Sequence, residues 1–252
     1  MIIGFIPARY GSTRLPGKPL LQFGQHNMIQ KVYLQCKKSS FLKKIYVLTD
    51  DERIQKAIED INGDVILIKE ECLNGTERIC IALKRYNDLF KECKCIVNIQ
   101  GDEPYMNPEH IDVAINAMIS NKDINVKCST LIFKIVDETL LHDTSIGKVV
   151  LNNKNEIIYC SRNVIPASKT KKYDVIKNDY YGHIGLFVFD KEYLINQYIK
   201  ENTPLQLVED IEWLKIIEQG YNIISSKVED YEIGVNTMED YMYLREKYHI
   251  DI

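Results

Sequence analysis

Residues 2–20 read IIGFIPARYGSTRLPGKPL and join an apolar run to a loop rich in glycines and cations. The bulky apolar residues from Ile2 to Ile6 predict a strand in the buried centre of a sheet. The loop that follows carries Arg9, Arg14 and Lys18 between small residues, so its backbone can approach an anion closely. Guanidinium forks and an ammonium group suit the oxygens of a polyphosphate. The stretch therefore predicts a strand that ends in a phosphate-binding loop.

This loop matches neither the Walker A pattern nor the G-x-G-x-x-G fingerprint, which lowers the support for an ATPase or a Rossmann dehydrogenase. The simplest alternative is a basic loop that only faces solvent. The preceding strand, the glycines and the two prolines favour phosphate binding over that alternative.

The first half of the chain alternates strand-length apolar runs with helical periods. Further strand-length runs occupy residues 45–49, 65–68 and 95–99. Apolar residues recur at helical spacing in residues 29–36, 54–61 and 111–118, the last set preceded by Asn107 as an N-cap and Pro108. This alternation predicts an α/β fold with an open, mostly parallel sheet and helices on both faces.

In such a sheet, ligands bind beyond the carboxyl ends of the strands. Residues 7–18, Asp50 and residues 100–104 all follow strand-length runs, so we expect them to converge at one edge of the sheet.

The segment Val97–Pro104, VNIQGDEP, places a carboxylate just past a buried strand. Gly101 permits a sharp turn there, and Asp102 is then well placed to hold Mg²⁺ against phosphate oxygens. Alone, the aspartate could merely shape a turn. Its expected position beside the cationic loop favours the metal-binding interpretation.

The segment Asn74–Arg78, NGTER, supplies a turn and one more cation. Alone it is more typical of a helix start, with Asn74 or Thr76 as the cap and Glu77 near the positive helix end.

Beyond residue 122 the pattern becomes strand-rich. Runs at residues 127–133, 148–151, 157–160 and 183–189, with a hairpin turn at 152–155, predict a smaller antiparallel lobe over about residues 123–189. Residues 1–122 and about 190–252 are predicted to form the nucleotide-binding core. Within that second stretch we expect a helix over 208–219, a strand over 221–228 and a last helix over 238–248.

Composition narrows the class of protein. The 252 residues are 45% hydrophobic and 27% charged, with apolar runs too short for a membrane span, which is typical of a soluble globular protein. The start of the chain lacks the basic region of a signal peptide, so we expect a cytoplasmic protein. Seven cysteines without a C-x-x-C pair favour reduced thiols. The net charge of −4 disfavours a general nucleic-acid binder.

These motifs occur in an order that points to a known family. The cationic loop, TDD at 49–51, NGTER, VNIQGDEP, YCSR at 159–162, HIGLFVF at 183–189 and GVNTMED at 234–240 together resemble the CMP-Kdo synthetases, also called 3-deoxy-manno-octulosonate cytidylyltransferases. The resemblance implies the fold of the nucleotide-diphospho-sugar transferases, with CTP and Mg²⁺ at the mouth of the sheet. It also implies that the anomeric hydroxyl of an acidic keto-deoxy sugar attacks the α-phosphorus, and that the protein is a homodimer assembled through its smaller lobe.

The resemblance implies a role for each matching residue. Arg9, Lys18 and Asp102 would be catalytic, and Asp102 and Asn236 would hold the metal. The nucleotide-binding set would be Ala8, Arg9, Gly11, Ser12, Arg14, Lys18, Asn74, Gly75, Thr76, Arg78 and Gln100. The sugar-binding set would be Gln100, Arg162, His183 and Glu212, with Arg162 as the partner of the sugar carboxylate.

At three positions the chain departs from the family pattern. Asn236 stands where the family has an aspartate, and an asparagine can coordinate a metal only through a neutral carbonyl oxygen. Glu239 and Asp240 are nearby carboxylates that could help. Trp213 and Phe187 replace a glutamine and a tyrosine on the sugar side, where lost polar contacts alter specificity.

Four functions therefore stay open at this point. The first is CMP transfer to 3-deoxy-manno-octulosonate (Kdo), and the second is the same reaction on another ulosonic acid, such as an amino-Kdo or a nonulosonate. A homologue that binds nucleotide without turnover is the third. A nucleotidylyltransferase for sugar 1-phosphates is the fourth, although the chain lacks the longer G-x-G-x-R loop of that class.

Overall fold

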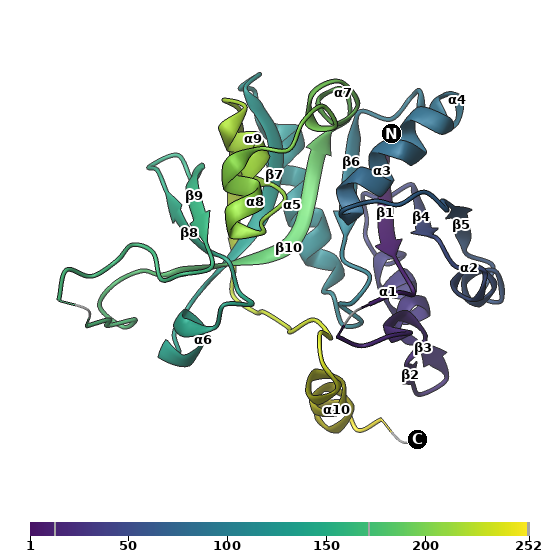
Figure 1. Ribbon diagram of the computed structural model, residues 1–252, viewed down its shortest axis with the longest axis horizontal. Helices are drawn as coiled ribbons and strands as arrows, with labels where there is room; N and C mark the ends of the chain where they lie inside the picture. Colours follow the sequence, from purple (N-terminus) through teal and green to yellow (C-terminus); the bar gives the residue numbers. More distant parts are fainter. Residues whose placement is uncertain (13, 171, 251–252) are drawn as a thin grey trace. The chain divides into compact units, whose positions relative to one another are not determined.

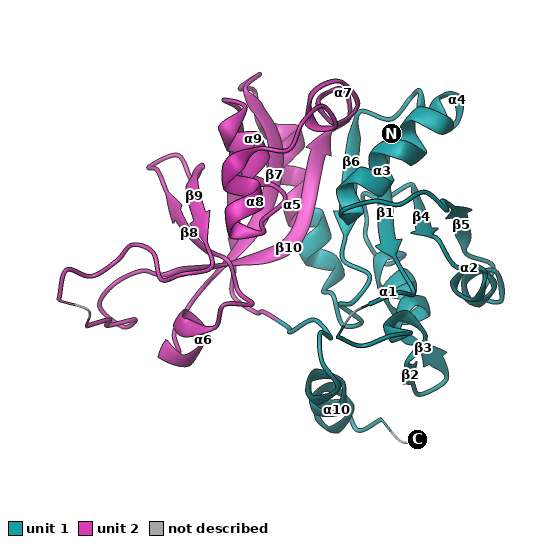
Figure 2. Cartoon of the chain, in the orientation of Figure 1, with its two compact units in different colours: residues 1–112, 232–252 teal, residues 113–231 magenta. Residues whose placement is uncertain are grey.

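The computed structural model describes residues 1–12, 14–170 and 172–250 and divides the chain into two compact units (Figure 2). The first unit contains Met1–Asp112 and Glu232–Ile252, and the second contains Val113–Tyr231. The boundary falls inside one helix, α5 (Pro108–Ser120). Asn107 Oδ1 accepts a hydrogen bond from the backbone N–H of Glu109 at 3.0 Å, which matches the predicted cap before Pro108.

The first unit contains a parallel sheet, as the sequence predicts, and its strands lie in the order β6-β1-β4-β5 (Figure 1). Its strands are β1 (Ile2–Ala8), β4 (Lys44–Thr49), β5 (Asp64–Leu67) and β6 (Cys95–Ile99). All three pairings are parallel, with Gly4 of β1 opposite Ile45 of β4 and Val97 of β6. The central residues, including Phe5, Val47 and Ile96, are completely buried.

Helices connect these strands. They are α1 (Met28–Cys36), α2 (Glu52–Glu59), α3 (Gly75–Arg85) and the short α4 (Asn87–Phe90), with the 3₁₀ turn η1 (Lys18–Leu20) and the small hairpin β2 (Gln22–Phe23) and β3 (His26–Asn27) after β1. The chain moves from β1 through β4 to β5 and then returns to the other side of β1 at β6. Because such crossovers are right-handed, this reversal puts α1 and α2 on one face and α3 on the other. The predicted fold class is confirmed.

The C-terminal helix α10 (Met238–Lys247) returns to the first unit and completes a separate apolar cluster. Val235, Tyr241 and Leu244 pack there with Leu15, Phe23 and Met28. A capping box starts the helix, because Thr237 accepts from the backbone N–H of Asp240 and the Asp240 carboxylate accepts from that of Thr237.

The second unit is built around a mixed sheet. Its strands are β7 (Val126–Lys134), β8 (Lys148–Leu151), β9 (Ile157–Ser161), β10 (Tyr181–Asp190) and β11 (Asn222–Val228). β10 is antiparallel to β7 and to β8, and the β8–β9 hairpin turns at Asn152–Asn155 as predicted. β11 pairs in parallel with β7. The helical segments are α6 (Glu138–His142), α7 (Lys191–Tyr193), the π-helical turn η2 (Leu194–Tyr198), α8 (Pro204–Glu209) and α9 (Leu214–Glu218).

Two sequence expectations differ from this architecture. The expected helix over 208–219 is two short helices, because Asp210 adopts a left-handed conformation with φ of 52° and ends α8. The compact second unit also extends beyond the lobe expected over 123–189. It does so because β11 pairs with β7, which makes residues 190–231 part of the same compact unit.

Candidate active site

A cavity of about 330 Å³ lies at the carboxyl ends of the strands in the first unit. It is lined by Pro7, Ala8, Arg9, Ser12, Arg14, Lys18, Pro19, Cys72, Leu73, Asn74, Gly75, Arg78, Gln100, Gly101, Asp102 and Asn236. These residues come from the loop after β1, the start of α3, the loop after β6 and the segment before α10. The convergence expected for residues 7–18 and 100–104 is therefore present, as the sheet topology requires.

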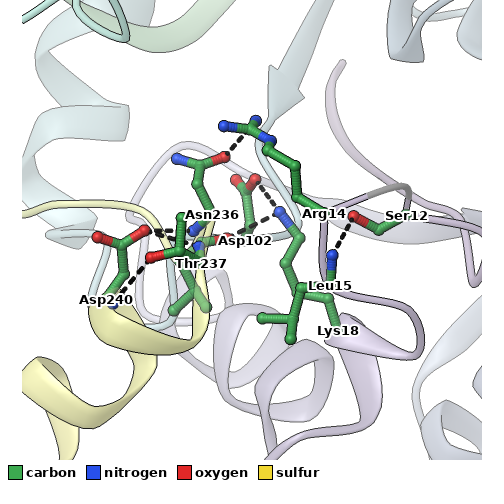
Figure 3. Close-up of polar contacts among 9 residues, drawn as sticks. Ser12, Arg14, Leu15, Lys18, Asp102, Asn236, Thr237 and Asp240 are labelled. Atoms are coloured by element: carbon green, nitrogen blue, oxygen red, sulfur yellow. Dashed lines mark hydrogen bonds and ion pairs between the residues drawn. The ribbon is translucent and has the colours of Figure 1, made fainter.

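Lys18 links two of these segments (Figure 3). Its ammonium group lies 2.7 Å from Asp102 Oδ2 and donates a hydrogen bond of 2.8 Å to the carbonyl oxygen of Val235. The Val235 N–H in turn donates to the carbonyl oxygen of Asp102 at 2.8 Å. These bonds attach the segment before α10 to the loop after β6, with Lys18 between them.

Arg14 and Asn236 form a second contact on the same side of the cavity. A guanidinium nitrogen of Arg14 donates to Asn236 Oδ1 at 3.1 Å, as Figure 3 shows. Arg9 and Arg14 are exposed, whereas Lys18 and Asp102 are half-buried. The cavity is therefore lined by four cations, one carboxylate and three carboxamides, which suits a ligand with several anionic oxygens.

Two glycines allow the backbone to pass close to Pro7. A Cβ atom on Gly101 would lie 2.8 Å from the carbonyl oxygen of Pro7, and one on Gly75 would lie 3.0 Å from the Pro7 ring. The first contact is with backbone, which cannot move aside as a flexible side chain can. Gly101 therefore lets Asp102 follow directly after β6 beside the loop from β1.

The start of α3 agrees with the prediction that NGTER begins a helix with Asn74 as its cap. Asn74 Oδ1 accepts from the backbone N–H of Glu77 at 2.9 Å. Thr76 is fully buried, and its hydroxyl accepts from Asn98 Nδ2 at 2.9 Å, so it supports β6 and does not line the cavity. Arg78 lines the cavity but is 5% exposed, and it donates to the carbonyl oxygen of Ile68 at 2.6 Å.

Asp102 and Asn236 offer the hard oxygen ligands that Mg²⁺ prefers. In the part of the chain that the structure describes, no group of three or more His, Cys, Asp or Glu side chains is arranged for a metal. Mg²⁺ is commonly held by one or two protein oxygens together with substrate phosphates and water, so two such oxygen groups at a cavity lined by cations fit this metal. Asp240 serves the helix instead, because its Oδ2 accepts from the N–H groups of Asn236 and Thr237 at 2.8 Å each.

Glu103 is the other acidic residue of this loop. Burial and, to a lesser extent, the neighbouring Asp102 carboxylate raise the pKa of Glu103 to about 8. A carboxyl that stays protonated near neutral pH adds no negative charge next to Asp102.

The remaining residues of the expected sugar set lie in the second unit. The Arg162 guanidinium is held by backbone carbonyl groups: Nε donates to Glu209 at 3.1 Å, Nη2 to Asp210 at 2.8 Å and Nη1 to Thr144 at 3.0 Å. The carboxylate of Glu209 accepts from the Arg162 N–H at 3.0 Å. In this conformation Arg162 joins the end of α8 to the loop before β8, so most of its donors are already engaged.

His183 packs against two aromatic side chains. Its ring centroid is 5.0 Å from that of Phe187 and 4.8 Å from that of Trp213. Burial lowers the pKa of His183 to about 3, so the ring is neutral at physiological pH. Thr130 donates its hydroxyl hydrogen to the carbonyl oxygen of Leu186 at 2.7 Å. The 2.8 Å contact between Thr130 Oγ1 and His183 Nε2 therefore places the ring hydrogen on Nε2.

Glu212 is half-buried between α8 and α9, and the hydroxyl of Tyr198 donates to its backbone carbonyl at 3.3 Å. Its charge also contributes to the raised pKa of Cys128, after the larger effect of burial.

Some lining residues were not anticipated from the sequence. Cys72, Leu73 and Pro19 line the cavity but carry no signal distinct from ordinary core or loop residues. Val235 contributes through its carbonyl oxygen, which every residue type possesses. Gly11, expected in the nucleotide set, does not line the cavity, and a Cβ there would meet open space.

The fold and the cavity together define a nucleotide-binding α/β protein whose cationic loop faces an acidic strand end. The sequence model of the cytidylyltransferase family matches residues 3–228. The chain belongs to this family, which confirms the family resemblance and makes the protein a nucleotidyltransferase.

Relatives and a solved structure agree with this assignment. The chain is 41% identical over 241 residues to a 3-deoxy-manno-octulosonate cytidylyltransferase of Protochlamydia amoebophila, covering 95% of this chain and 91% of the relative. It is 39% identical to a mitochondrial 3-deoxy-manno-octulosonate cytidylyltransferase of Arabidopsis thaliana, covering 95% and 80%. A CMP:2-keto-3-deoxy-manno-octonic acid synthetase solved in complex with CTP superposes with a TM-score of 0.89 and 28% identity, covering 98% of each chain.

No helix in the described ranges is both long enough and apolar enough to cross a membrane.

Proposed function

We propose that this protein transfers CMP from CTP to the anomeric hydroxyl of Kdo and releases pyrophosphate. The observation that carries the proposal is the single cavity shared by Arg9, Arg14, Lys18 and Asp102 in the first unit. The names of the relatives support both CTP as the nucleotide and Kdo as the acceptor.

The chain's own residues can support this displacement without a covalent intermediate. Arg9 and Arg14 bind and orient the triphosphate, and Lys18 balances the charge that develops as the pyrophosphate oxygen leaves. Mg²⁺, when bound by Asp102 and Asn236, supplies further charge neutralisation at the phosphate oxygens. Binding the acceptor hydroxyl and the α-phosphorus together removes much of the entropic barrier.

The test is to incubate the protein with CTP, Mg²⁺ and a panel of free ulosonic acids and to measure pyrophosphate release. We expect release with Kdo that requires both CTP and the acid. Measurable CTP binding without release for any acid would refute the enzymatic proposal and favour a binding homologue.

A second acceptor is favoured by one observation. Phe187 and Trp213 are each 3% exposed and pack on His183, so apolar side chains surround this ring at two positions where the family pattern has polar groups. Faster pyrophosphate release with an amino-Kdo or a nonulosonate than with Kdo would assign the protein to that acceptor instead.

The metal proposal can be tested at Asn236. Replacing it by aspartate adds a charged oxygen ligand, so Asn236→Asp should lower the Mg²⁺ concentration needed for half-maximal turnover. Asn236→Ala, which removes the ligand oxygen, should raise it. Unchanged Mg²⁺ dependence in both variants would exclude Asn236 as a ligand.

We also propose that the protein is a homodimer assembled through the second unit. Val208 is 83% exposed, Leu207 is 62% exposed and Ile158 is 55% exposed, and such apolar side chains favour a protein interface. Sedimentation velocity should show a dimer that Val208→Glu weakens. A monomer at every concentration would contradict the proposal.

A further inference from the structure

The backbone of Tyr10 closes the bend of the cationic loop. Its carbonyl oxygen accepts hydrogen bonds from the N–H groups of Ser12 at 2.9 Å and Gly17 at 3.0 Å. One peptide group therefore fixes two points of the loop that lie on either side of Arg14.

The side chain of Tyr10 is held as closely as its backbone. Gly17 is left-handed with φ of 71°, and a Cβ there would lie 3.1 Å from the Tyr10 hydroxyl and 3.2 Å from Cζ. Arg53 of α2 places its guanidinium carbon 3.4 Å from the centroid of the Tyr10 ring. This distance is typical of a cation–π contact.

Arg53 is itself fixed by the cap of its helix. Asp51 accepts from Arg53 Nε at 2.9 Å and from Nη2 at 2.6 Å, a two-point pair that sets the plane of the guanidinium. The Asp51 carboxylate also caps α2 through the Arg53 N–H at 2.9 Å. Neither residue lines the cavity.

Asp50 connects the same loop to α3. One carboxylate oxygen accepts from the Tyr10 N–H at 3.4 Å, and the other accepts from Arg78 Nη2 at 3.1 Å. The end of β4 thus holds two of the segments that line the cavity, the cationic loop and the start of α3.

We propose that Tyr10, Asp50 and Arg53 are positioning residues that hold the cationic loop in the shape that presents Arg9, Arg14 and Lys18 to a triphosphate. Three like charges within ten residues repel one another, and the exposed side chains of Arg9 and Arg14 do not fix the loop by packing. Ordering a flexible loop when a ligand binds costs free energy. A loop that is already ordered avoids this cost, so it binds the triphosphate more tightly. This inference rests on the proposed function for the identity of the ligand.

The test uses inorganic tripolyphosphate and CTP as separate probes of the full-length protein. Tyr10→Ala and Arg53→Ala should each weaken tripolyphosphate and CTP binding by about tenfold, while CMP binding changes less because CMP has one phosphate. Tyr10→Phe keeps the ring and should lose much less affinity. Lys56→Ala is the matched control, because Lys56 lies on the same helix, its side chain is 77% exposed and its ammonium group pairs with Asp60.

Amide hydrogen exchange gives a readout that does not depend on any ligand. The N–H groups of Ser12 and Gly17 should exchange faster in Tyr10→Ala and Arg53→Ala than in the wild type, with the thermal midpoint nearly unchanged in Arg53→Ala. Unchanged tripolyphosphate affinity and unchanged exchange in both variants would overturn the inference. Absence of CTP turnover in a wild type that still binds tripolyphosphate would refute the proposed function alone.

Discussion

At the scale of single residues, Lys18 connects three of the segments that line the cavity. It contacts a carboxylate of the loop after β6 and a carbonyl oxygen of the segment before α10, and it belongs to the loop after β1. A lysine ammonium group has three donors, so two can keep these bonds while the third is donated to an incoming phosphate.

We expect Lys18→Ala to lower kcat/KM for CTP by about 10²–10³-fold, the usual effect of removing one electrostatic stabiliser of a transition state. Pyrophosphate release measures the loss. Lys91→Ala, at an exposed position after α4, is the control that should retain full turnover. Turnover of Lys18→Ala close to that of the wild type would remove Lys18 from the catalytic set, and the same measurement on Asp102→Asn tests its partner.

His183 gives a prediction about pH. Its pKa is about 3 in the folded protein and 6.5 in the unfolded chain, so between these values the unfolded chain binds the extra proton. The contribution of His183 to the free energy of unfolding therefore falls as the pH is lowered from 6.5 to about 3, by at most about 1.4 kcal/mol per pH unit. His183→Gln should flatten the dependence of the urea midpoint on pH between pH 6 and pH 4.

The control for this experiment is His142→Gln, at an exposed position at the end of α6. If the urea midpoints of the wild type and His183→Gln depend on pH in the same way, His183 is not buried in its neutral form.

Some of the charged residues that line the cavity could be predicted from the sequence. Arg9, Arg14, Lys18 and Asp102 are charged residues in glycine-containing loops that follow strands, and that pattern is visible in the sequence. Thr76 shares a motif with lining residues but points into the interior, because the helix that starts at Gly75 turns its hydroxyl toward Asn98. A linear motif does not reveal which of its members face a ligand.

At the scale of elements, the junction between α8 and α9 is the main departure from periodicity. Apolar residues continue at helical spacing through the junction, yet Asp210 is left-handed and the backbone carbonyl groups of Glu209 and Asp210 accept from Arg162. The interruption depends on a side chain about fifty residues earlier in the chain, so local periodicity could not predict it. In the first unit, the four strands β1, β4, β5 and β6 and the helices α1, α2 and α10, which depend on local patterns, were predicted to within a few residues, whereas the short β2–β3 hairpin and α4 were not predicted.

Asp210→Gly should raise the free energy of unfolding by about 0.5–1 kcal/mol, because glycine adopts the left-handed conformation without the steric cost of a Cβ. The Asp210 side chain is 98% exposed, so little packing is lost. Urea denaturation measures the change. Asp210→Val should lower stability, and a valine variant as stable as the wild type would show that the junction is not constrained.

At the scale of the whole molecule, the first unit is assembled from two separated parts of the chain. Val235, Tyr241 and Leu244 from the C-terminal part pack with Leu15 and Met28 from the N-terminal part. The sequence predicted a discontinuous core, but the extent of the intervening unit depends on β11 pairing with β7, which is a long-range contact.

Leu244 is completely buried in this cluster, and truncating such a leucine costs about 2–5 kcal/mol. Leu244→Ala should therefore lower the thermal midpoint and, because the segment before α10 contacts Lys18, weaken CTP binding as well. Met242→Ala, on the same helix but 54% exposed, is the matched control. Equal midpoints for the two variants would mean that this cluster does not stabilise the first unit.

The bond between Lys18 and the carbonyl oxygen of Val235 also has a consequence during biosynthesis. A ribosome makes Lys18 and Asp102 early, then the whole of residues 113–231, and only afterwards Val235, whose carbonyl oxygen accepts from Lys18. The nascent first unit therefore carries an unfinished cavity and an uncovered apolar patch at Leu15 and Met28 throughout that interval. A chaperone that binds exposed apolar segments should engage ribosome-bound chains stalled before residue 232 and release those extended past α10.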